Sequence, residues 1–110
     1  MRNYYVRDNS LAVNGIYTAF PRKVENGYLF AGETHDFWEM MYCAKGFATV
    51  TSGDRVVTLA EDQCIFFRPM EFHSFRVEKN ANSLFFIISF SADGDATKNW
   101  KERYFTLTES

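Results

Sequence analysis

One stretch of the sequence, HDFWEMMYCAKGFATVTSGDRVVTLAEDQCIFFRPMEFH from His35 to His73, decides the fold. Within it, short apolar runs alternate with turn-forming residues at Lys45-Gly46, Ser52-Gly53-Asp54 and Glu61-Asp62. Turns at intervals of about 8–12 residues are typical of all-β folds. The pattern continues on both sides of this stretch. It predicts about eight strands, near residues 16–20, 28–32, 35–44, 47–51, 55–60, 63–68, 72–77 and 83–91.

The composition indicates a single domain over residues 1–110. Of its residues, 46% are hydrophobic and 18% aromatic, which is enough for one packed core in a chain too short for two. Positive and negative charges are interspersed and sum to -2, so a basic surface for nucleic acid is not expected. No apolar run approaches the roughly 18 residues of a membrane span, and no signal peptide is recognisable. We therefore expect a cytoplasmic domain with reduced Cys43 and Cys64.

The two ends of the chain depart from the strand pattern. Residues 1–10 are a candidate N-terminal arm that could fold over the barrel mouth, although a disordered start is the more usual fate of such residues. After Phe90, a turn at Asp93-Gly94-Asp95 precedes apolar residues at helical spacing, namely Ala96, Trp100 and Tyr104. The sequence therefore predicts a short C-terminal helix within residues 93–110.

Two histidines, His35 and His73, are the only ones in the chain, and each stands at the start of an expected strand. Side chains alternate between the two faces of a strand, so every second residue shares a surface. Counting in this way from both histidines and along the last expected strand predicts an inward-facing ligand-binding surface. Its members are His35, Phe37, Glu39, Met41, His73, Phe75, Phe85, Ile87 and Ser89. The opposite face of the first of these strands carries Trp38, Met40 and Tyr42, which form an outer patch unless another segment covers them.

These positions resemble the sequence motifs of cupins. Gly27, Glu33, His35, Glu39 and Gly46 have the spacing of the first motif, G-x5-H-x-H-x3-E-x6-G, with Glu33 in place of its first histidine. Pro69 and His73 resemble the second motif, although the spacing is one residue shorter and Glu71 replaces a glycine. The resemblance implies an all-β jelly roll of the cupin type, that is, a double-stranded β-helix.

The finer pattern over roughly residues 27–91 is similar to the N-terminal sensor domains of AraC-type transcription regulators. The similar stretches are HDFWEM from His35, the pair Lys45-Gly46, and FFRPMEFHSF from Phe66 to Phe75. The resemblance implies a domain that binds a small effector, such as a sugar, and that has neither catalytic activity nor a cofactor. It also implies that DNA is bound only by a separate C-terminal domain, toward which residues 103–109 would lead.

Other interpretations of the same residues stay open. His35, Glu39 and His73 could hold a divalent metal ion in a stand-alone cupin enzyme, although the sensor domains of the resembled family usually hold none. Glu39 could instead form a structural ion pair with Arg68 or Arg76. The aromatic side chains could fill the barrel completely, as in small barrels, leaving a dimerisation module. We predict the sensor, without metal, as a monomer or a homodimer.

Overall fold

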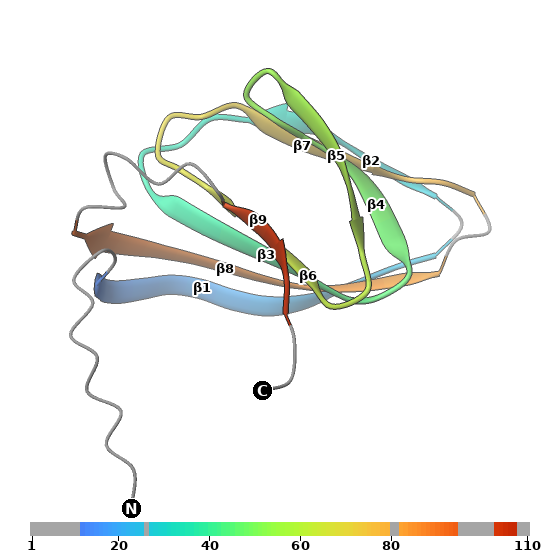
Figure 1. The fold of residues 1–110 in the computed structure, drawn as a ribbon, viewed down its shortest axis with the longest axis horizontal. Helices are drawn as coiled ribbons and strands as arrows, with labels where there is room; N and C mark the ends of the chain where they lie inside the picture. The colour runs from blue at the N-terminus through green and yellow to red at the C-terminus, as the bar shows by residue number, and fades with distance from the viewer. Residues whose placement is uncertain (1–11, 26, 80–81, 95–102, 108–110) are drawn as a thin grey trace, which may run out of the picture.

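The described part of the protein forms two antiparallel β-sheets that face each other (Figure 1). The computed structural model describes residues 12–25, 27–79, 82–94 and 103–107. The larger sheet has the order β1-β8-β3-β6-β9 and the smaller one the order β2-β7-β4-β5. The strands of the larger sheet are β1 (Ala12–Val24), β8 (Ser83–Asp93), β3 (Trp38–Lys45), β6 (Gln63–Phe67) and β9 (Tyr104–Thr106). Those of the smaller sheet are β2 (Tyr28–Glu33), β7 (His73–Val77), β4 (Phe47–Ser52) and β5 (Arg55–Ala60).

All eight predicted strands are present. The predicted start of one of them is wrong, and this affects two of the predicted ligand-binding residues. The strand predicted for residues 35–44 begins at Trp38, because its ladder with β8 starts at the pair Trp38 and Phe90. His35 and Phe37 therefore lie in the loop between β2 and β3, where the alternation of faces does not apply. Among the described residues no helix is long and apolar enough to cross a membrane.

The C-terminal segment differs from the prediction. The expected helix falls mainly on residues 95–102, which lie outside the described residues, as does the expected arm at 1–10. Tyr104, predicted on the apolar face of that helix, is instead the first residue of β9 and pairs with Ile65. The free edge of β6 offers backbone hydrogen bonds, and Phe105 of β9 stacks on Phe66 with 6.1 Å between ring centroids. These contacts with a distant strand favour the strand conformation at Tyr104 over the helix that the spacing of Ala96, Trp100 and Tyr104 predicted. The described part of the chain contains no helix.

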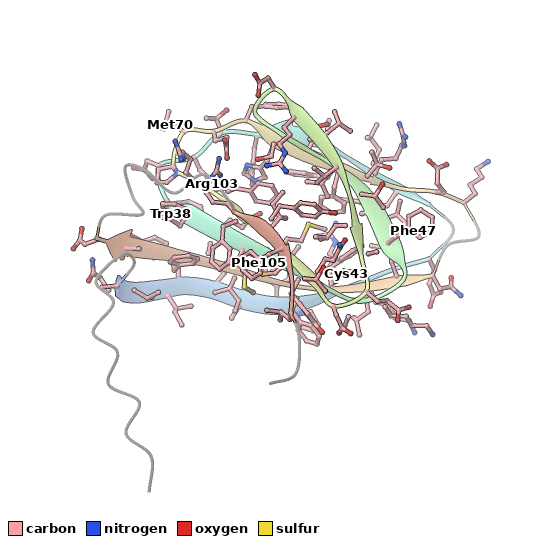
Figure 2. The ribbon with its side chains drawn as sticks, viewed as in Figure 1. Trp38, Cys43, Phe47, Met70, Arg103 and Phe105 are labelled. Carbon is pink, nitrogen blue, oxygen red and sulfur yellow. The ribbon has the colours of Figure 1, made fainter. Side chains whose placement is uncertain are left out.

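The core lies between the two sheets, and the central pairing of β3 with β8 supplies much of it. Met41 is opposite Ile87 and Cys43 is opposite Phe85, and all four side chains are buried in one cluster. Cys43 is labelled in Figure 2. Glu39 is opposite Ser89 on the same face. The inward face predicted for these two strands is therefore confirmed.

The outer face of the larger sheet is buried at one end only. Trp38 is 2% exposed and stacks on Phe90, and the ring of Phe66 meets Phe90 edge-on. Met40 and Tyr42 are half-buried, and Phe86 is 41% exposed. The outer patch expected from Trp38, Met40 and Tyr42 is thus smaller than predicted, because Trp38 does not belong to it.

Both cysteines are free and buried. Burial raises the pKa of the Cys43 thiol to about 11 and that of Cys64 to about 12. Both thiols therefore stay protonated at neutral pH and pack as small apolar side chains.

Gly46 is required by the turn between β3 and β4. Its φ is 80°, in the left-handed region that side chains with a Cβ rarely adopt. A Cβ at this position would also lie 2.6 Å from the backbone oxygen of Asn82. The glycine of the motif is thus explained by backbone geometry.

We predict that Gly46→Ala lowers the free energy of unfolding by at least about 2 kcal/mol, because it combines strain with a backbone clash. Urea unfolding followed by circular dichroism measures this change. Gly15→Ala is the control, since a Cβ there meets only Ser91 Oγ at an ordinary 3.7 Å. An equal loss of stability in both variants would contradict the explanation.

Candidate functional site

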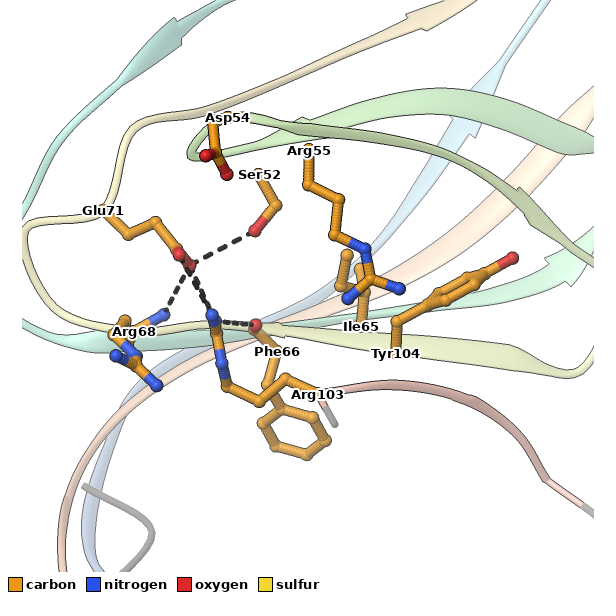
Figure 3. Close-up of a pocket in the computed structure, with 9 residues that line it drawn as sticks. All are labelled: Ser52, Asp54, Arg55, Ile65, Phe66, Arg68, Glu71, Arg103 and Tyr104. Carbon is orange, nitrogen blue, oxygen red and sulfur yellow. Dashed lines mark hydrogen bonds and ion pairs between the residues drawn. The ribbon is translucent and has the colours of Figure 1, made fainter. Parts of the chain in front are cut away.

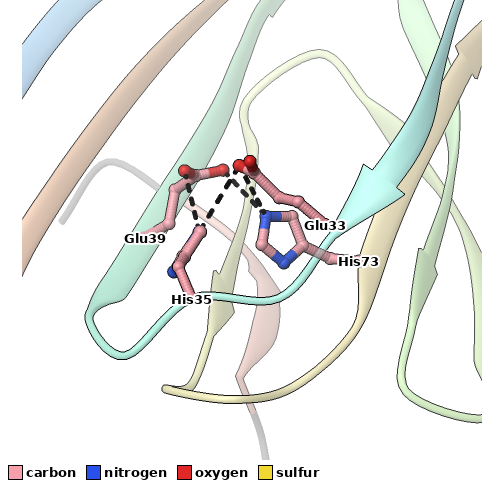
Figure 4. A group of neighbouring side chains, drawn as sticks. All are labelled: Glu33, His35, Glu39 and His73. Carbon is pink, nitrogen blue, oxygen red and sulfur yellow. Dashed lines mark ion pairs between the residues drawn. The ribbon is translucent and has the colours of Figure 1, made fainter.

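Four titratable side chains meet at one end of the interior (Figure 4). Glu33 ends β2, His35 lies in the following loop, Glu39 is on β3, and His73 begins β7. One ligand atom from each of them lies within 4.8 Å of the other three. We call these four residues the His-Glu cluster.

Each imidazole of the cluster directs Nε2 at both carboxylates. His35 Nε2 lies 3.6 Å from Glu33 Oε1 and 3.5 Å from Glu39 Oε1. His73 Nε2 lies 3.8 Å from Glu33 Oε1 and 3.4 Å from Glu39 Oε2. Both Nε2 atoms are buried and have no hydrogen-bond partner.

The other ring nitrogens determine the tautomer. Nδ1 of His35 lies 2.9 Å from the carbonyl oxygen of Phe37, and Nδ1 of His73 lies 3.2 Å from that of Glu71. A carbonyl can only accept, so each Nδ1 carries the proton and donates it. Each Nε2 of a neutral ring therefore presents a lone pair to the carboxylates.

Aromatic stacking holds both rings in place. His35 stacks on Phe37 with 3.8 Å between centroids, and His73 stacks on Phe67 with 4.3 Å. The backbone N–H of Met70 donates to the carbonyl of His35 at 2.6 Å, which joins the two loops that carry the histidines. The donor atoms are thus positioned before anything binds.

Lone pairs facing carboxylates repel each other unless a cation lies between them. A proton is one such cation. Burial lowers the pKa of His73, but Glu39, the backbone oxygen of Glu71 and the charge of Glu33 together outweigh it, so the pKa lies above its ordinary value. A divalent metal ion is the other, because two imidazole nitrogens and two carboxylates suit the first-row transition metals. The donor set therefore fits either occupant.

A cavity of about 180 Å³ adjoins the cluster between the two sheets, on the side of β1 and β2. Its lining combines aromatic and aliphatic side chains with an arginine, a tyrosine and two carboxylates. The lining residues are Phe20, Arg22, Tyr28, Phe30, Glu33, Glu39, Phe75 and Ile87. Arg22 donates to the Tyr28 hydroxyl at 2.5 Å, and its guanidinium lies 4.7 Å from the centroid of that ring.

The structure brings together only part of the predicted binding surface. Glu39, Phe75 and Ile87 line the cavity, and His35 and His73 stand beside it in the cluster. The remaining predicted residues have other surroundings. Met41 and Phe85 are packed in the core, Ser89 forms a hydrogen bond with Thr18, and Phe37 lies against His35 and Tyr17.

Several cavity residues were missed from the sequence. Glu33 occupies the position of a motif histidine, and that spacing was the available signal. Arg22 and Tyr28 belong to no motif, and they meet only because β1 and β2 approach each other at the cavity. A structural ion pair between Glu39 and Arg76 was one of the open interpretations. Arg76 instead pairs with Glu78 on the surface, and Glu39 pairs with the two histidines.

A second cavity, of about 270 Å³, lies between the turn that joins β4 to β5 and the strands β6 and β9 (Figure 3). Glu71 and Arg103 both line this cavity and are joined there by two hydrogen bonds. Arg103 donates to both carboxylate oxygens of Glu71, at 2.7 and 3.0 Å. Ser52 Oγ and the backbone N–H of Arg68 also donate to Glu71, at 3.2 and 3.3 Å. Burial raises the pKa of Glu71, but the hydrogen bonds and charge of Arg103 and the hydrogen bonds from Arg68 and Ser52 together outweigh it. The pKa therefore lies below its ordinary value, and this carboxylate is ionised at neutral pH.

Glu71 thereby positions the cluster from outside it. Its side chain joins three segments, while its backbone oxygen orients His73. The glutamate that replaces the motif glycine thus has a structural role.

Two facing antiparallel sheets, with a polar cluster and a cavity between them, define a β-sandwich of the small-ligand-binding class. Comparison with protein families narrows this class. Residues 18–105 match the AraC-like ligand binding domain, and the chain belongs to this family. The resemblance found in the sequence is therefore confirmed. No curated protein matches the chain.

Solved structures support the fold. A cupin superfamily protein from Desulfitobacterium hafniense is 12% identical, with a TM-score of 0.60 over 77% of this chain and 81% of that one. A Thermus thermophilus protein is 18% identical, with a TM-score of 0.60 over 64% and 69% of the two chains. An oxalate decarboxylase mutant from Bacillus subtilis is 17% identical, with a TM-score of 0.56 over 76% of this chain and 24% of that one. At these identities the likeness concerns the fold alone.

We predict that Glu71→Gln lowers the free energy of unfolding by about 3 kcal/mol, because it leaves the largely buried Arg103 without its carboxylate. Thermal and urea unfolding measure the loss. Glu78→Gln is the matched control: its pair with Arg76 is more than half exposed on both sides, so a change below about 1 kcal/mol is expected. Similar values for the two variants would show that Glu71 does not hold the loops together.

Proposed function

We propose that this chain is the effector-sensing domain of a bacterial AraC-type transcription regulator, and that its effector binds in the cavity between β1 and β2. The observation that carries the proposal is this cavity itself, in which an arginine, a tyrosine and two carboxylates converge among apolar side chains. Small-molecule sites have this composition. Membership of a ligand-binding family supports the same function.

The lining suggests the chemistry of the effector. Glu33 and Glu39 offer acceptors for hydroxyl groups, Arg22 offers donors, and the rings of Phe30 and Phe75 offer flat apolar faces. At about 180 Å³ the cavity is smaller than the roughly 300 Å³ at which sites for drug-sized ligands begin. A sugar or a related small hydroxylated metabolite fits both features.

Binding would act through a shift between conformations rather than through a reaction. The effector changes the equilibrium only if it binds one arrangement of the domain more tightly than another. The cavity wall includes Phe20 and Arg22 of the edge strand β1 and Tyr28 and Phe30 of the edge strand β2. These two strands are the elements whose relative position a bound molecule would stabilise. DNA would be contacted by a separate domain in the cytoplasm.

A filled dimerisation module is the weaker alternative. Met41 and Phe85 do fill the core, as that interpretation requires. The cavity beside Glu39, however, has a polar lining that a module without a ligand does not need. Pairing of two copies stays a prediction.

We expect a sugar or small hydroxy acid to raise the melting temperature of the domain in a saturable way, because a ligand that binds only the folded state stabilises it. Differential scanning fluorimetry against pentoses, hexoses and hydroxy acids, followed by calorimetric titration of the hits, provides the measurement. A flat response across the panel would count against the effector site.

For a compound found in this way, Arg22→Met should weaken binding by about 10-fold, the usual effect of losing one charged hydrogen bond. The change removes the guanidinium from the cavity while keeping an apolar chain of similar length. Arg76→Met, on the exposed face of β7, is the control and should leave the affinity unchanged. Equal affinities for both variants would place the effector elsewhere.

A further inference from the structure

We propose that the second cavity, between the turn that joins β4 to β5 and the strands β6 and β9, binds a small organic acid through the guanidinium group of Arg55. The two cavities lie at opposite edges of the sandwich, because β1 and β2 are the edge strands on one side and β9 and β5 those on the other. No described residue lines both of them. The proposal therefore goes beyond effector sensing between β1 and β2, and it rests on the charge, the geometry and the size of the second cavity.

The lining of this cavity carries a net positive charge. Three of its side chains are arginines, which stay protonated in proteins, and two are carboxylates. The arginines are Arg55, Arg68 and Arg103, and the carboxylates belong to Asp54 and Glu71. These described groups leave one positive charge in excess. An anion with a single negative charge balances it, whereas a neutral or cationic ligand does not.

The pair of Glu71 and Arg103 shows how an arginine of this cavity binds a carboxylate. Arg103 donates to both oxygens of Glu71, and its Nη1 also donates to the carbonyl of Phe66 at 2.9 Å. Two parallel hydrogen bonds are the strong form of the contact between arginine and carboxylate. Arg103 is thus engaged within the protein, so a ligand has to be held chiefly by Arg55.

Arg55 is well placed to hold a ligand. It is the first residue of β5, and its guanidinium lies 5.7 Å from the centroid of the Tyr104 ring and reaches over that ring into the cavity (Figure 3). No carboxylate of the described residues forms an ion pair with Arg55. A guanidinium that lies on an aromatic face keeps its N–H groups for an acceptor in its own plane. Its donors are therefore available to a bound acid.

The ring beneath Arg55 is itself held in place. The Tyr104 hydroxyl donates to the carbonyl of Thr58 at 2.5 Å, and Tyr104 pairs with Ile65 in the ladder between β6 and β9. Because the guanidinium lies on a ring that two sheets fix, little ordering is needed when a ligand binds. The same ring and Ile65 give the cavity an apolar wall beside its charges.

The size of the cavity indicates an organic acid rather than a bare ion. Its volume of about 270 Å³ comes close to the roughly 300 Å³ at which sites for drug-sized ligands begin. A carboxylate matches the planar fork of an arginine and carries the single charge that the lining lacks. Its carbon body can lie against Tyr104 and Ile65. A phosphate group matches the same fork but carries a charge nearer two at neutral pH.

The test uses benzoate and hexanoate as probes, each compared with its uncharged amide. Calorimetric titration of the domain in a Tris buffer of low ionic strength measures the affinity, and scanning fluorimetry measures the melting temperature. We expect at least one acid to bind once per chain and to raise the melting temperature. It should bind at least about 10-fold more tightly than its amide, which lacks the charge-assisted hydrogen bonds. Sodium chloride should weaken the binding, because it screens a partly exposed charge.

Arg55→Gln tests the residue on which the proposal depends. The position is exposed, so the fold should persist, and the affinity for the acid should fall by at least about 10-fold. Arg76→Gln is the matched control, since it changes an exposed arginine of β7 outside the cavity and should leave the affinity unchanged. Arg22→Met should also bind the acid as the unchanged domain does, because Arg22 lines the other cavity.

Three results would overturn the site: no binding of either acid, equal affinity for acid and amide, or equal affinity of Arg55→Gln and the unchanged domain. Tighter binding of inorganic phosphate than of both acids would overturn the class of ligand. Loss of acid binding in Arg22→Met but not in Arg55→Gln would place the acid in the effector cavity and would likewise contradict this proposal. Because the two cavities share no described lining residue, the failure of one proposal does not affect the other.

Discussion

The antiparallel pairing of β3 with β8 is the constraint on which the site depends. It sets Glu39 opposite Ser89, Met41 opposite Ile87 and Cys43 opposite Phe85, so that one face of both strands points between the sheets. A slip of one residue would exchange the two faces and bring Trp38 inward in place of Glu39. Burial of Met41, Cys43, Phe85 and Ile87 opposes such a slip, because each of these side chains would lose its contacts in the core. The position of a polar carboxylate is thus maintained by apolar packing.

The histidines reach the same place by a different route, since neither is positioned by the central ladder. His35 lies in a loop and is held by its stacking on Phe37 and by the bond from Met70 N–H to its carbonyl. His73 begins β7 and is oriented by the backbone oxygen of Glu71, whose side chain is bound in turn by Arg103. The cluster therefore combines one rigid wall with two loops that polar contacts hold in place. The four side chains are therefore held in place, and the cavity on the side of β1 and β2 still adjoins them.

Much of the fold followed from local patterns. Turn residues and apolar runs predicted all eight strands, because strand length and turn chemistry depend on residues near in sequence. Alternation predicted the inward faces of β3 and β8 correctly. It does not apply to His35 and Phe37, which precede the first pair of the ladder, and His35 joins the cluster from its loop. Helical spacing failed at Tyr104, where the free edge of β6 offered a pairing partner far away in sequence. Both errors occurred where a distant strand, rather than the local residues, determined the conformation.

The sequence by itself determined the all-β class, the family resemblance and the spacing that singles out His35, Glu39 and His73, since these depend on residue type and order. Only the tertiary structure decided that both Nε2 atoms are buried without partners, that Glu33 joins the cluster, and that Arg22 and Tyr28 face the same cavity. The reason is physical. Protonation, burial and cavity shape arise from groups that meet across two sheets, and a pattern along one strand carries no information about what lies on the other side of the interior.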